Sequence, residues 1–280
     1  MKKLIINLAP TGMIPTKKMT PHVPESPAEI IADVLQCAPL GVSMAHLHAR
    51  DTDGVPTYKK EIYNEIIAGI KEKNKELIIV VSTSGRTFGE FWQRSDALEL
   101  DGGVKPDMAS LTLSSLNFLK TASTNSPDMI IKLAEKMREK GIKPELEVFD
   151  FGMMNFAHYL IKKEIVEPPY YFNILLGNIA TAQAKLLHLG LIISELPENS
   201  VWAIAGIGEC QCRMNALSIV EGGGVRVGLE DNIWYDEERT RLATNYDLVQ
   251  RLAKVAAAVE RPIATPVEVR ELLKLRPPRS

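Results

Sequence analysis

Eight short apolar runs alternate with amphipathic segments along the whole of this 280-residue chain, and this alternation constrains the fold more than any other feature. A continuous apolar run bounded by turn residues is typical of a strand that is buried on both faces, as in a parallel sheet. The runs that we expect to form strands are 4–8, 43–48, 77–82, 108–111, 145–148, 171–175, 202–205 and 225–227.

Between these runs, apolar residues recur at the spacing of an amphipathic helix. Two of the segments have clear ends: Ser26-Pro27 followed by Glu29 is a signal for a helix start, and Gly141 is a signal for a helix end. The predicted helices are 27–37, 60–73, 88–98, 127–140, 153–163, 180–194, 211–221 and 246–259.

Eight strand–helix units of roughly 30 residues each predict a single (β/α)8 TIM barrel, an α/β fold of about 250 residues. An open doubly wound sheet is built from the same units, so periodicity alone does not exclude it. No internal repeat or linker divides the chain, which favours one domain over residues 1–280. The stretch 262–280 has four prolines and a basic end, and we expect it to wrap the barrel or a neighbouring subunit.

Composition excludes several classes of function. The net charge is −2, the isoelectric point is about 6.3 and no basic stripe stands out, so nucleic acid and anionic membranes are poor partners. No apolar stretch approaches the ~20 residues that a membrane span needs. The three cysteines are an odd number, and only Cys210 and Cys212 lie close together, which indicates a reducing compartment. We therefore expect a cytoplasmic protein.

The second predicted strand ends in Ala-His-Leu-His-Ala-Arg-Asp, residues 45–51. Residues i and i+2 of a strand face the same side, so His46 and His48 project together at the end of the barrel where ligands bind. Two imidazoles at this spacing can hold one metal ion, whereas two unpaired histidines buried in a barrel would be costly. The pair predicts a divalent metal site, and zinc is the ion that histidine pairs most often hold.

A catalytic zinc ion takes a third protein ligand and leaves one position open. Glu230 and Asp231 follow the eighth predicted strand, on which Arg226 and Gly228 share one face. Glu230 would have to reach across the first strand towards the second to join the histidines. An acidic turn or a helix N-terminus is an equally good interpretation of Glu230-Asp231 from spacing alone.

Other polar residues follow neighbouring strands. Residues 82–86, Ser-Thr-Ser-Gly-Arg, leave backbone N–H groups open to an oxygen-rich ligand, and Ser110 ends the fourth strand. Glu145 and Glu147 share one face of the fifth strand, where a carboxylate can act as a general base or orient a histidine. The glycines within 205–209 and 222–224 predict room for a phosphate or a CoA tail, with close packing as the alternative.

Four segments in the same order resemble the β-keto acid cleavage enzyme family, whose type member cleaves 3-keto-5-aminohexanoate. They are Ala-Pro-Thr-Gly at 9–12, the histidine segment 45–51, Lys-Pro-Glu-Leu-Glu-Val-Phe-Asp at 143–150, and Val-Arg-Val-Gly-Leu-Glu-Asp-Asn at 225–232. The resemblance runs from about residue 5 to 260. It implies a zinc-dependent TIM barrel that assembles as a homotetramer.

The resemblance also implies an acyltransferase activity. A β-keto acid and acetyl-CoA would give acetoacetate and a new acyl-CoA by a retro-Claisen route. The match assigns a role to nine residues and leaves those that bind CoA unassigned. His46, His48 and Glu230 correspond to the metal ligands, Arg226 and Asp231 to the charged pair that prepares deprotonation, Glu147 to an active-site acid, and Ser82, Gly85 and Ser110 to substrate contacts.

Two points of chemistry accompany these roles. Arg226 beside Asp231 would keep that carboxylate ionised and lower its basicity through the opposite charge. The family member with an amino-substituted substrate has an acid just after the Thr-Gly of the first loop, whereas this chain has Met13-Ile14. We therefore expect an apolar or carboxylate-bearing β-keto acid as the substrate.

The alternative is another metal-dependent barrel enzyme, a hydrolase or an aldolase with the same His-x-His ligands. Hydrolases of this kind commonly need further histidines on strands five and six. His158 and His188 fall in predicted helices and His22 falls in a loop, which counts against that alternative. A binding protein without catalysis would have little use for Arg226 and Asp231 beside an open metal position.

Overall fold

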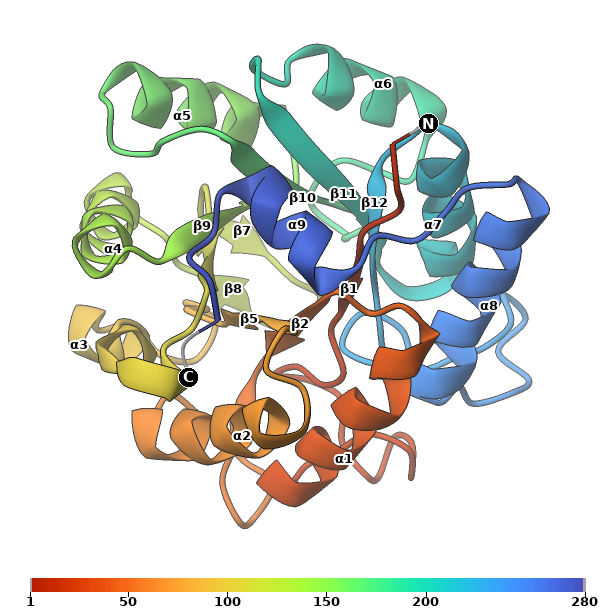
Figure 1. Cartoon of the computed structure of the whole chain (residues 1–280). Helices are drawn as coiled ribbons and strands as arrows, with labels where there is room; N and C mark the ends of the chain where they lie inside the picture. The colour runs from red at the N-terminus through yellow and green to blue at the C-terminus, as the bar shows by residue number, and fades with distance from the viewer. Residues whose placement is uncertain (1, 279–280) are drawn as a thin grey trace.

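The computed structural model describes residues 2–278, and its centre is a closed barrel of eight parallel strands (Figure 1). The strands are β1 Ile6–Leu8, β2 Met44–Leu47, β5 Ile78–Val81, β6 Met108–Thr112, β9 Lys143–Val148, β10 Tyr170–Leu176, β11 Ser200–Gly206 and β12 Gly224–Val227. Closure comes from β1, which pairs with β2 on one side and with β12 on the other. The predicted TIM barrel is confirmed, and the open sheet is excluded.

Helices surround the barrel on the outside (Figure 1), and their buried apolar residues share one core with those of the strands. Seven of them are α1 Pro27–Cys37, α2 Lys60–Lys73, α4 Pro127–Lys140, α5 Phe151–Lys162, α6 Leu186–Ser194, α7 Gln211–Val220 and α8 Asn245–Ala258. The predicted end signals act as expected. Ser26 and Glu29 form a capping box at the start of α1, and Gly141 ends α4 in the left-handed conformation, with φ of 61°.

Two predicted helices are shorter than expected. The segment 88–98 contains only α3, Phe91–Arg94, and a 3-10 turn, Asp96–Glu99. The regular helix ends there because Arg94 turns inward and donates from Nε to the carbonyl of Thr83. The segment 180–194 becomes helical only at Leu186, because residues 178–183 form a turn in which Gln183 Nε2 donates to the carbonyl of Asn178.

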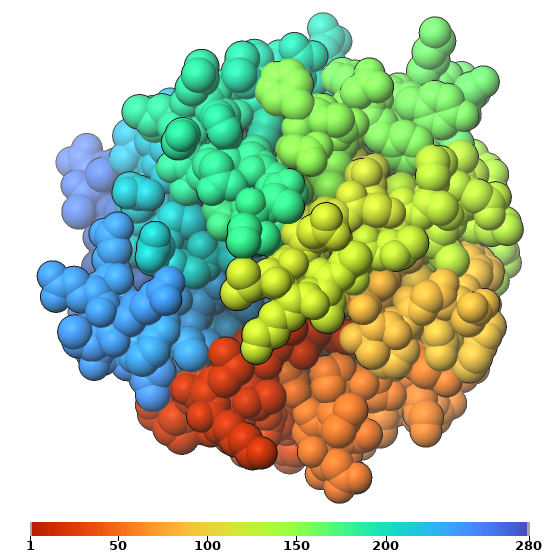
Figure 2. All heavy atoms as spheres, turned by 180° about the vertical axis from the view of Figure 1, so that it is seen from behind, coloured from red at the N-terminus to blue at the C-terminus, as the bar shows by residue number. Residues whose placement is uncertain are grey.

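Two small hairpins follow the C-terminal ends of barrel strands, and neither was predicted. One joins β3, Ala49–Arg50, to β4, Pro56–Thr57, after β2. The other joins β7, Leu116–Asn117, to β8, Ala122–Ser123, after β6. Figure 2 shows this end of the molecule, where the yellow segment with β7 and β8 meets the red N-terminal segment near the centre.

The other end of the barrel is closed by the C-terminal extension. Its helix α9, Pro266–Leu273, lies across the N-terminal ends of the strands (Figure 1). Val269 and Leu273 of α9 pack on Ile5, Met44 and other buried apolar residues inside the barrel. The described part of the extension thus lies against the barrel, and residues 279 and 280 lie outside the described residues.

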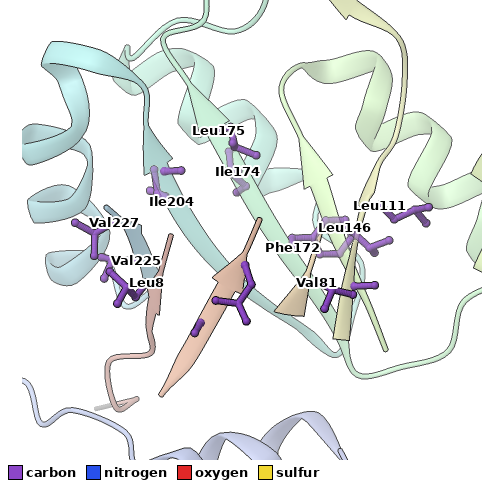
Figure 3. Packing of buried hydrophobic residues seen from close by; sticks show 14 of the residues in the cluster. Leu8, Val81, Leu111, Leu146, Phe172, Ile174, Leu175, Ile204, Val225 and Val227 are labelled. Carbon is purple, nitrogen blue, oxygen red and sulfur yellow. The ribbon is translucent and has the colours of Figure 1, made fainter. Parts of the chain in front are cut away.

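The larger hydrophobic core lies between the strands and the surrounding helices. Figure 3 shows part of it, with Leu8, Val81, Leu146 and Phe172 pointing away from the barrel interior. This leaves the alternate, inward positions of the same strands free for other residues. No helix among the described residues is long and apolar enough to cross a membrane.

Candidate active site at the C-terminal end of the barrel

The two predicted histidines lie side by side inside the barrel. His46 is the third residue of β2 and His48 follows that strand, and both side chains are buried. Their ring centroids are 5.3 Å apart. Both rings face Glu230, with His48 Nε2 at 3.1 Å from Glu230 Oε1 and His46 Nε2 at 3.9 Å from Glu230 Oε2. The reach of Glu230 across the first strand is therefore observed.

Two glycines allow Glu230 to occupy this place. Gly228 has φ of 150° and crosses so close to Ala9 that a Cβ there would overlap the Ala9 carbonyl oxygen. The N–H of Glu230 then donates to that carbonyl at 3.2 Å. A Cβ on Gly12 of the first loop would overlap Glu230 Cγ, so this glycine leaves the space that the carboxylate side chain fills.

The residues in this group fit a divalent metal ion. One ligand atom from each of His46, His48 and Glu230 lies within 4.8 Å of the others. Glu230 Oε2 is buried and has no hydrogen-bond partner among the described residues, although it lies 3.9 Å from His46 Nε2. Two imidazoles and one carboxylate are a donor set typical of catalytic metal sites with an open position. The role of the three residues as ligands stays a prediction.

Glu145 orients His46 through Nδ1, the ring nitrogen that does not face Glu230. Its Oε2 is 2.6 Å from His46 Nδ1, and its Oε1 accepts hydrogen bonds from Asn7 Nδ2 at 2.7 Å and Asn173 Nδ2 at 3.3 Å. Burial by itself would raise the pKa of Glu145, but the charge and hydrogen bond of His46 outweigh it and lower that pKa. Sequence left open whether Glu145 is a base or a positioning residue, and its contacts indicate a positioning residue.

The two histidines differ in their affinity for a proton. Burial and Arg226 lower the pKa of His46, but the carboxylates of Glu145 and Glu230 outweigh them, so this pKa is raised. Burial dominates at His48 and lowers its pKa. A metal ion needs neutral imidazoles, so binding of a cation would release the proton that these carboxylates favour on His46.

Arg226 on β12 connects the carboxylates around the histidines. Its Nε donates to Asp231 Oδ2 at 2.9 Å and its Nη2 to Asp231 Oδ1 at 3.1 Å, which is a bidentate pair. The same Nη2 lies 2.8 Å from Glu230 Oε1, and Nη1 lies 3.4 Å from Glu147 Oε1. One buried guanidinium thus pairs with three carboxylates, including Asp231, the partner that was predicted for it.

Two carboxylates at this site, Asp231 and Glu147, have pKa values raised above the ordinary range by burial. Burial raises the pKa of Asp231, and the opposing charge of Arg226 does not cancel this effect. Arg226 lowers the pKa of Asp231 through its charge and hydrogen bond, as expected, and burial outweighs this contribution. Burial also raises the pKa of Glu147, whose Oε2 accepts a hydrogen bond from Thr112 Oγ1 at 2.6 Å. A raised pKa suits a carboxylate that must accept a proton.

The three residues predicted to contact substrate lie around the loop after β5. Ser110 accepts the N–H of Thr83 at 3.1 Å and its carbonyl accepts Thr83 Oγ1 at 2.6 Å, so it holds this loop. Gly85 packs so tightly on Arg94 and a neighbouring carbonyl that a Cβ would not fit. The hydroxyl of Ser82 accepts the N–H of Ser84 at 3.2 Å. Each residue has a structural role, and their contact with substrate stays a prediction.

One glycine prediction is wrong. Residues 222–224 lie at the N-terminal end of β12, opposite the histidines, and Gly223 packs against the ring of Trp202. They cannot receive the phosphate of a ligand bound at the C-terminal end. Gly206, at the end of β11, packs against the backbone of Cys210 and Gln211. Close packing, the alternative, explains Gly206 and Gly223. Nothing lies within 4 Å of a Cβ on Gly208, so room for a ligand in the segment 205–209 stays a prediction.

The remaining histidines lie away from this group. His158 Nε2 on α5 contacts the carbonyl of Glu195 at 2.8 Å, and His188 Nδ1 on α6 accepts the N–H of Gln183 at 2.9 Å. Neither joins a group of potential metal ligands among the described residues. The additional histidines that a metal-dependent hydrolase of this kind would use are thus not in the site.

Sequence reasoning missed three residues that support the site. Asn7 and Asn173 interrupt apolar strands, and this pattern could have marked them as inward-facing partners of Glu145. Arg50 is buried and donates to the carbonyls of Pro15 at 2.7 Å and Gly54 at 2.7 Å, which ties the first loop to the hairpin after β2. No local pattern in the sequence indicates those two partners.

Comparisons with known proteins agree with this geometry. The family model described as "beta-keto acid cleavage enzyme" matches residues 3–275. The chain is 37% identical over 277 residues to 3-keto-5-aminohexanoate cleavage enzyme of Fusobacterium nucleatum, with 99% of each chain covered. It is 32% identical to 3-oxoadipate:acetyl-CoA acetyltransferase of Cupriavidus necator, over 97% of this chain and 94% of that one.

A solved structure has the same fold. The apo structure of ObcA superposes with a TM-score of 0.77 at 19% identity, and the match covers 91% of this chain and 66% of that one. A ternary complex of ObcA with a C4-CoA adduct and oxalate superposes with a TM-score of 0.76 at 20% identity, over 91% of this chain and 68% of that one. At this identity the likeness shows the barrel fold alone.

Proposed function

The chain belongs to the β-keto acid cleavage enzyme family, and on that premise we propose how its residues carry out the family reaction. A β-keto acid R–CO–CH2–COO− and acetyl-CoA react to give acetoacetate and R–CO–CoA. The CH2–COO− unit moves from the acyl group R–CO to the acetyl group, and the acyl group moves to CoA. The relatives are named as acetyl-CoA-dependent enzymes of this kind, which supports the assignment.

The observation that carries the mechanism is the bidentate pair of Arg226 and Asp231 beside the group His46, His48 and Glu230. Asp231 is the base that takes a proton from the carbon between the ketone and the carboxylate. Arg226 orients Asp231, and burial keeps its pKa high enough to accept the proton. Glu147 is the second active-site acid, and Thr112 and Arg226 hold it in place.

The group His46, His48 and Glu230 would hold the metal ion, which we propose is zinc. When bound, zinc supplies Lewis acidity towards the substrate oxygens and so makes the neighbouring proton more acidic. Glu145 keeps the His46 ring turned so that Nε2, and not Nδ1, faces this position. Ser82, Gly85 and Ser110 line the loop that we propose contacts the substrate.

After deprotonation, the carbon nucleophile attacks the thioester carbonyl of acetyl-CoA and forms the new carbon–carbon bond. The CoA thiolate that leaves then attacks the former ketone carbon, and the old carbon–carbon bond breaks. Asp231 holds the abstracted proton during these steps and returns it to the acetoacetate carbon. No additional oxidant or reductant is needed, so the step balances with the two substrates alone.

The test is a coupled assay for acetoacetate with the zinc-loaded protein, acetyl-CoA and a panel of β-keto acids. We expect acetoacetate and an acyl-CoA in equal amounts, and turnover that stops when either substrate is left out. An absence of acetoacetate across the panel, with the metal content verified by mass spectrometry, would overturn the proposal and favour a hydrolase. Activity on 3-keto-5-aminohexanoate equal to that on neutral β-keto acids would overturn the expected substrate preference.

We also propose that the protein is a homotetramer in the cytoplasm. The resemblance to the family supports the tetramer, and the three free cysteines, of which Cys37 and Cys210 are buried, agree with a reducing compartment. Light scattering coupled to size-exclusion chromatography should give about four times the mass of one 31.1 kDa chain. A monomer at micromolar concentration would contradict the tetramer without affecting the proposed activity.

A further inference from the structure

One arginine at the mouth of the barrel, Arg86, has no role in the mechanism above. It lies in the loop between β5 and α3, and its side chain is half-buried. The guanidinium stacks on the ring of Phe118, with Cζ 3.3 Å from the ring centroid. Within residues 2–278, the guanidinium of Arg86 makes neither a hydrogen bond nor an ion pair, and only its backbone N–H is bonded, to Ser84 Oγ.

Arg94 contacts the same loop and, unlike Arg86, uses its guanidinium in hydrogen bonds within the described part of the protein. It is buried, and its guanidinium donates to the carbonyl of Thr83 at 2.8 Å, to the carbonyl of Thr124 at 3.1 Å and to Asn125 Oδ1 at 2.6 Å. The loop therefore already has the arginine that holds it. Arg86 leaves its donors available for a ligand.

Arg86 lies at the same end of the barrel as the candidate metal group, because its loop follows the C-terminal end of β5 and Phe118, on which it stacks, follows β6. Burial lowers its pKa, while the nearby charges of Glu230, Glu147 and Asp231 act in the opposite direction. These are the carboxylates that surround the candidate metal group. A substrate whose reacting carbons lie beside Asp231 would therefore have this cation at the same end of the barrel as its far end.

Phe118 gives the guanidinium a fixed support. It lies in the turn between β7 and β8, where its N–H donates to the carbonyl of Thr121 at 2.8 Å. Its ring packs edge-on against Phe149 with the centroids 5.9 Å apart. A guanidinium stacked on a ring keeps its N–H groups in the plane, where they can form a bidentate pair with a carboxylate.

We propose that Arg86, supported by Phe118, is a subsite for a second carboxylate at the far end of the substrate, so that the enzyme prefers a β-keto dicarboxylic acid. This inference rests on the proposed function, whose substrates all carry the first carboxylate. The first loop agrees with it: Met13 and Ile14 stand where an acid would be needed for an amino group, and Ile14 is exposed.

Two other anions could meet this arginine. One is the carboxylate next to the ketone, which every β-keto acid has. That group is needed at the reacting end beside Asp231, where the metal ligands and Arg226 are already gathered. The other is the phosphate part of CoA. The long pantetheine arm separates those phosphates from the thioester, which places them outside the mouth.

The experiment compares 3-oxoadipate with 3-oxohexanoate, two six-carbon β-keto acids that differ only in the distal carboxylate. We expect the wild type to prefer 3-oxoadipate. Arg86→Gln should lower kcat/KM for 3-oxoadipate about 30-fold, as for loss of a charged hydrogen-bond pair, and change kcat/KM for 3-oxohexanoate less than about threefold. The KM for acetyl-CoA should not change.

Each other outcome overturns the inference in a recognisable way. An equal loss on both acids assigns Arg86 to the shared carboxylate, and a raised KM for acetyl-CoA with both acids assigns it to CoA. A wild type that prefers 3-oxohexanoate rejects the subsite but leaves the proposed function standing. A wild type that turns over neither acid, nor any other β-keto acid, rejects the proposed function itself.

Two further variants separate recognition from folding. Lys120→Gln removes an exposed cation from the same hairpin and should leave both activities unchanged. Phe118→Leu keeps the charge of Arg86 but removes its support, so it should lower kcat/KM for 3-oxoadipate alone, and less than Arg86→Gln does. Equal losses on both acids with Phe118→Leu would mean that the hairpin acts only on the shape of the site.

Discussion

The two ends of this barrel are built from the same strands but have opposite chemistry. At the N-terminal end, inward positions such as Met44 on β2 and Tyr171 on β10 form an apolar layer that α9 covers. At the C-terminal end, the next inward positions on the same strands are His46 and Asn173, and Glu145 lies between them. The apolar layer and the buried network of charged groups are thus only two residues apart along each strand.

The comparison shows that burial stabilises the fold at one end of the barrel and costs free energy at the other. Burying apolar surface at the α9 end stabilises the fold without any directional requirement. Burying charge at the other end costs free energy unless the groups have partners, and there Arg226 pairs with Asp231, Glu230 and Glu147. We therefore expect variants at the C-terminal end to reduce activity and variants at the α9 end to reduce stability.

The largest effect should come from the histidine pair. His46→Ala removes a proposed ligand, so we expect bound metal to fall well below one per chain. We expect kcat/KM to fall about a thousandfold, because a Lewis-acid contribution of several kcal/mol converts at about 1.4 kcal/mol per tenfold. His22→Ala, in an exposed loop, is the matched control. Full metal content in His46→Ala would reject the proposed ligand group.

Glu145→Gln should have a smaller effect, because Glu145 touches the site only through His46. Replacing a carboxylate that orients a metal-binding histidine weakens metal binding about 10- to 100-fold. Competition with a chelator should show this loss, and excess zinc should restore most of the activity. Glu135→Gln, on the exposed face of α4, should bind zinc like the wild type. An unchanged zinc affinity in Glu145→Gln would show that His46 needs no partner.

Gly12→Ala tests whether the first loop shapes the site by leaving space. A Cβ there would overlap Glu230 Cγ, so the carboxylate must move away from the histidines. Overpacking of this kind costs roughly 1–3 kcal/mol, and we expect zinc affinity to fall roughly tenfold. Gly89→Ala is the control, because nothing lies within 4 Å of a Cβ there. Equal zinc affinity in the two variants would mean that Glu230 is not held by this contact.

Sequence predicted the parts that depend on short-range periodicity. The inward pairing of His46 with His48, and of Glu145 with Glu147, follows from the two-residue repeat of a strand. Eight repeated units predicted the barrel, but its closure needed the structure, because an open sheet has the same local pattern. Glu230 was assigned by resemblance and not by spacing, since its reach depends on the space left by Gly12, which is far away in the sequence.

The parts that could not be predicted depend on contacts between distant segments. The contact of Arg86 with Phe118 brings together two loops whose sequences show no strand or helix pattern. The break in the helix predicted over 88–98 arises because Arg94 bonds to carbonyls that neighbouring loops bring within reach. The segment 222–224 could have been placed correctly, because glycines before a strand lie at the N-terminal end of a barrel.

The smallest effect on activity should come from the α9 end, and this is the sharpest test of the comparison. Leu273 is fully buried in the apolar seal, whereas its neighbour Leu272 is 51% exposed. Leu273→Ala should lower the free energy of unfolding by about 2–5 kcal/mol in denaturant titrations, because it leaves a cavity, and Leu272→Ala should change it by less than about 0.5 kcal/mol. Both variants should keep the kcat/KM of the wild type per folded molecule. A loss of activity in Leu273→Ala at a temperature where it is fully folded would mean that the apolar layer transmits its packing to Glu145 and His46, and the two ends would then not be independent.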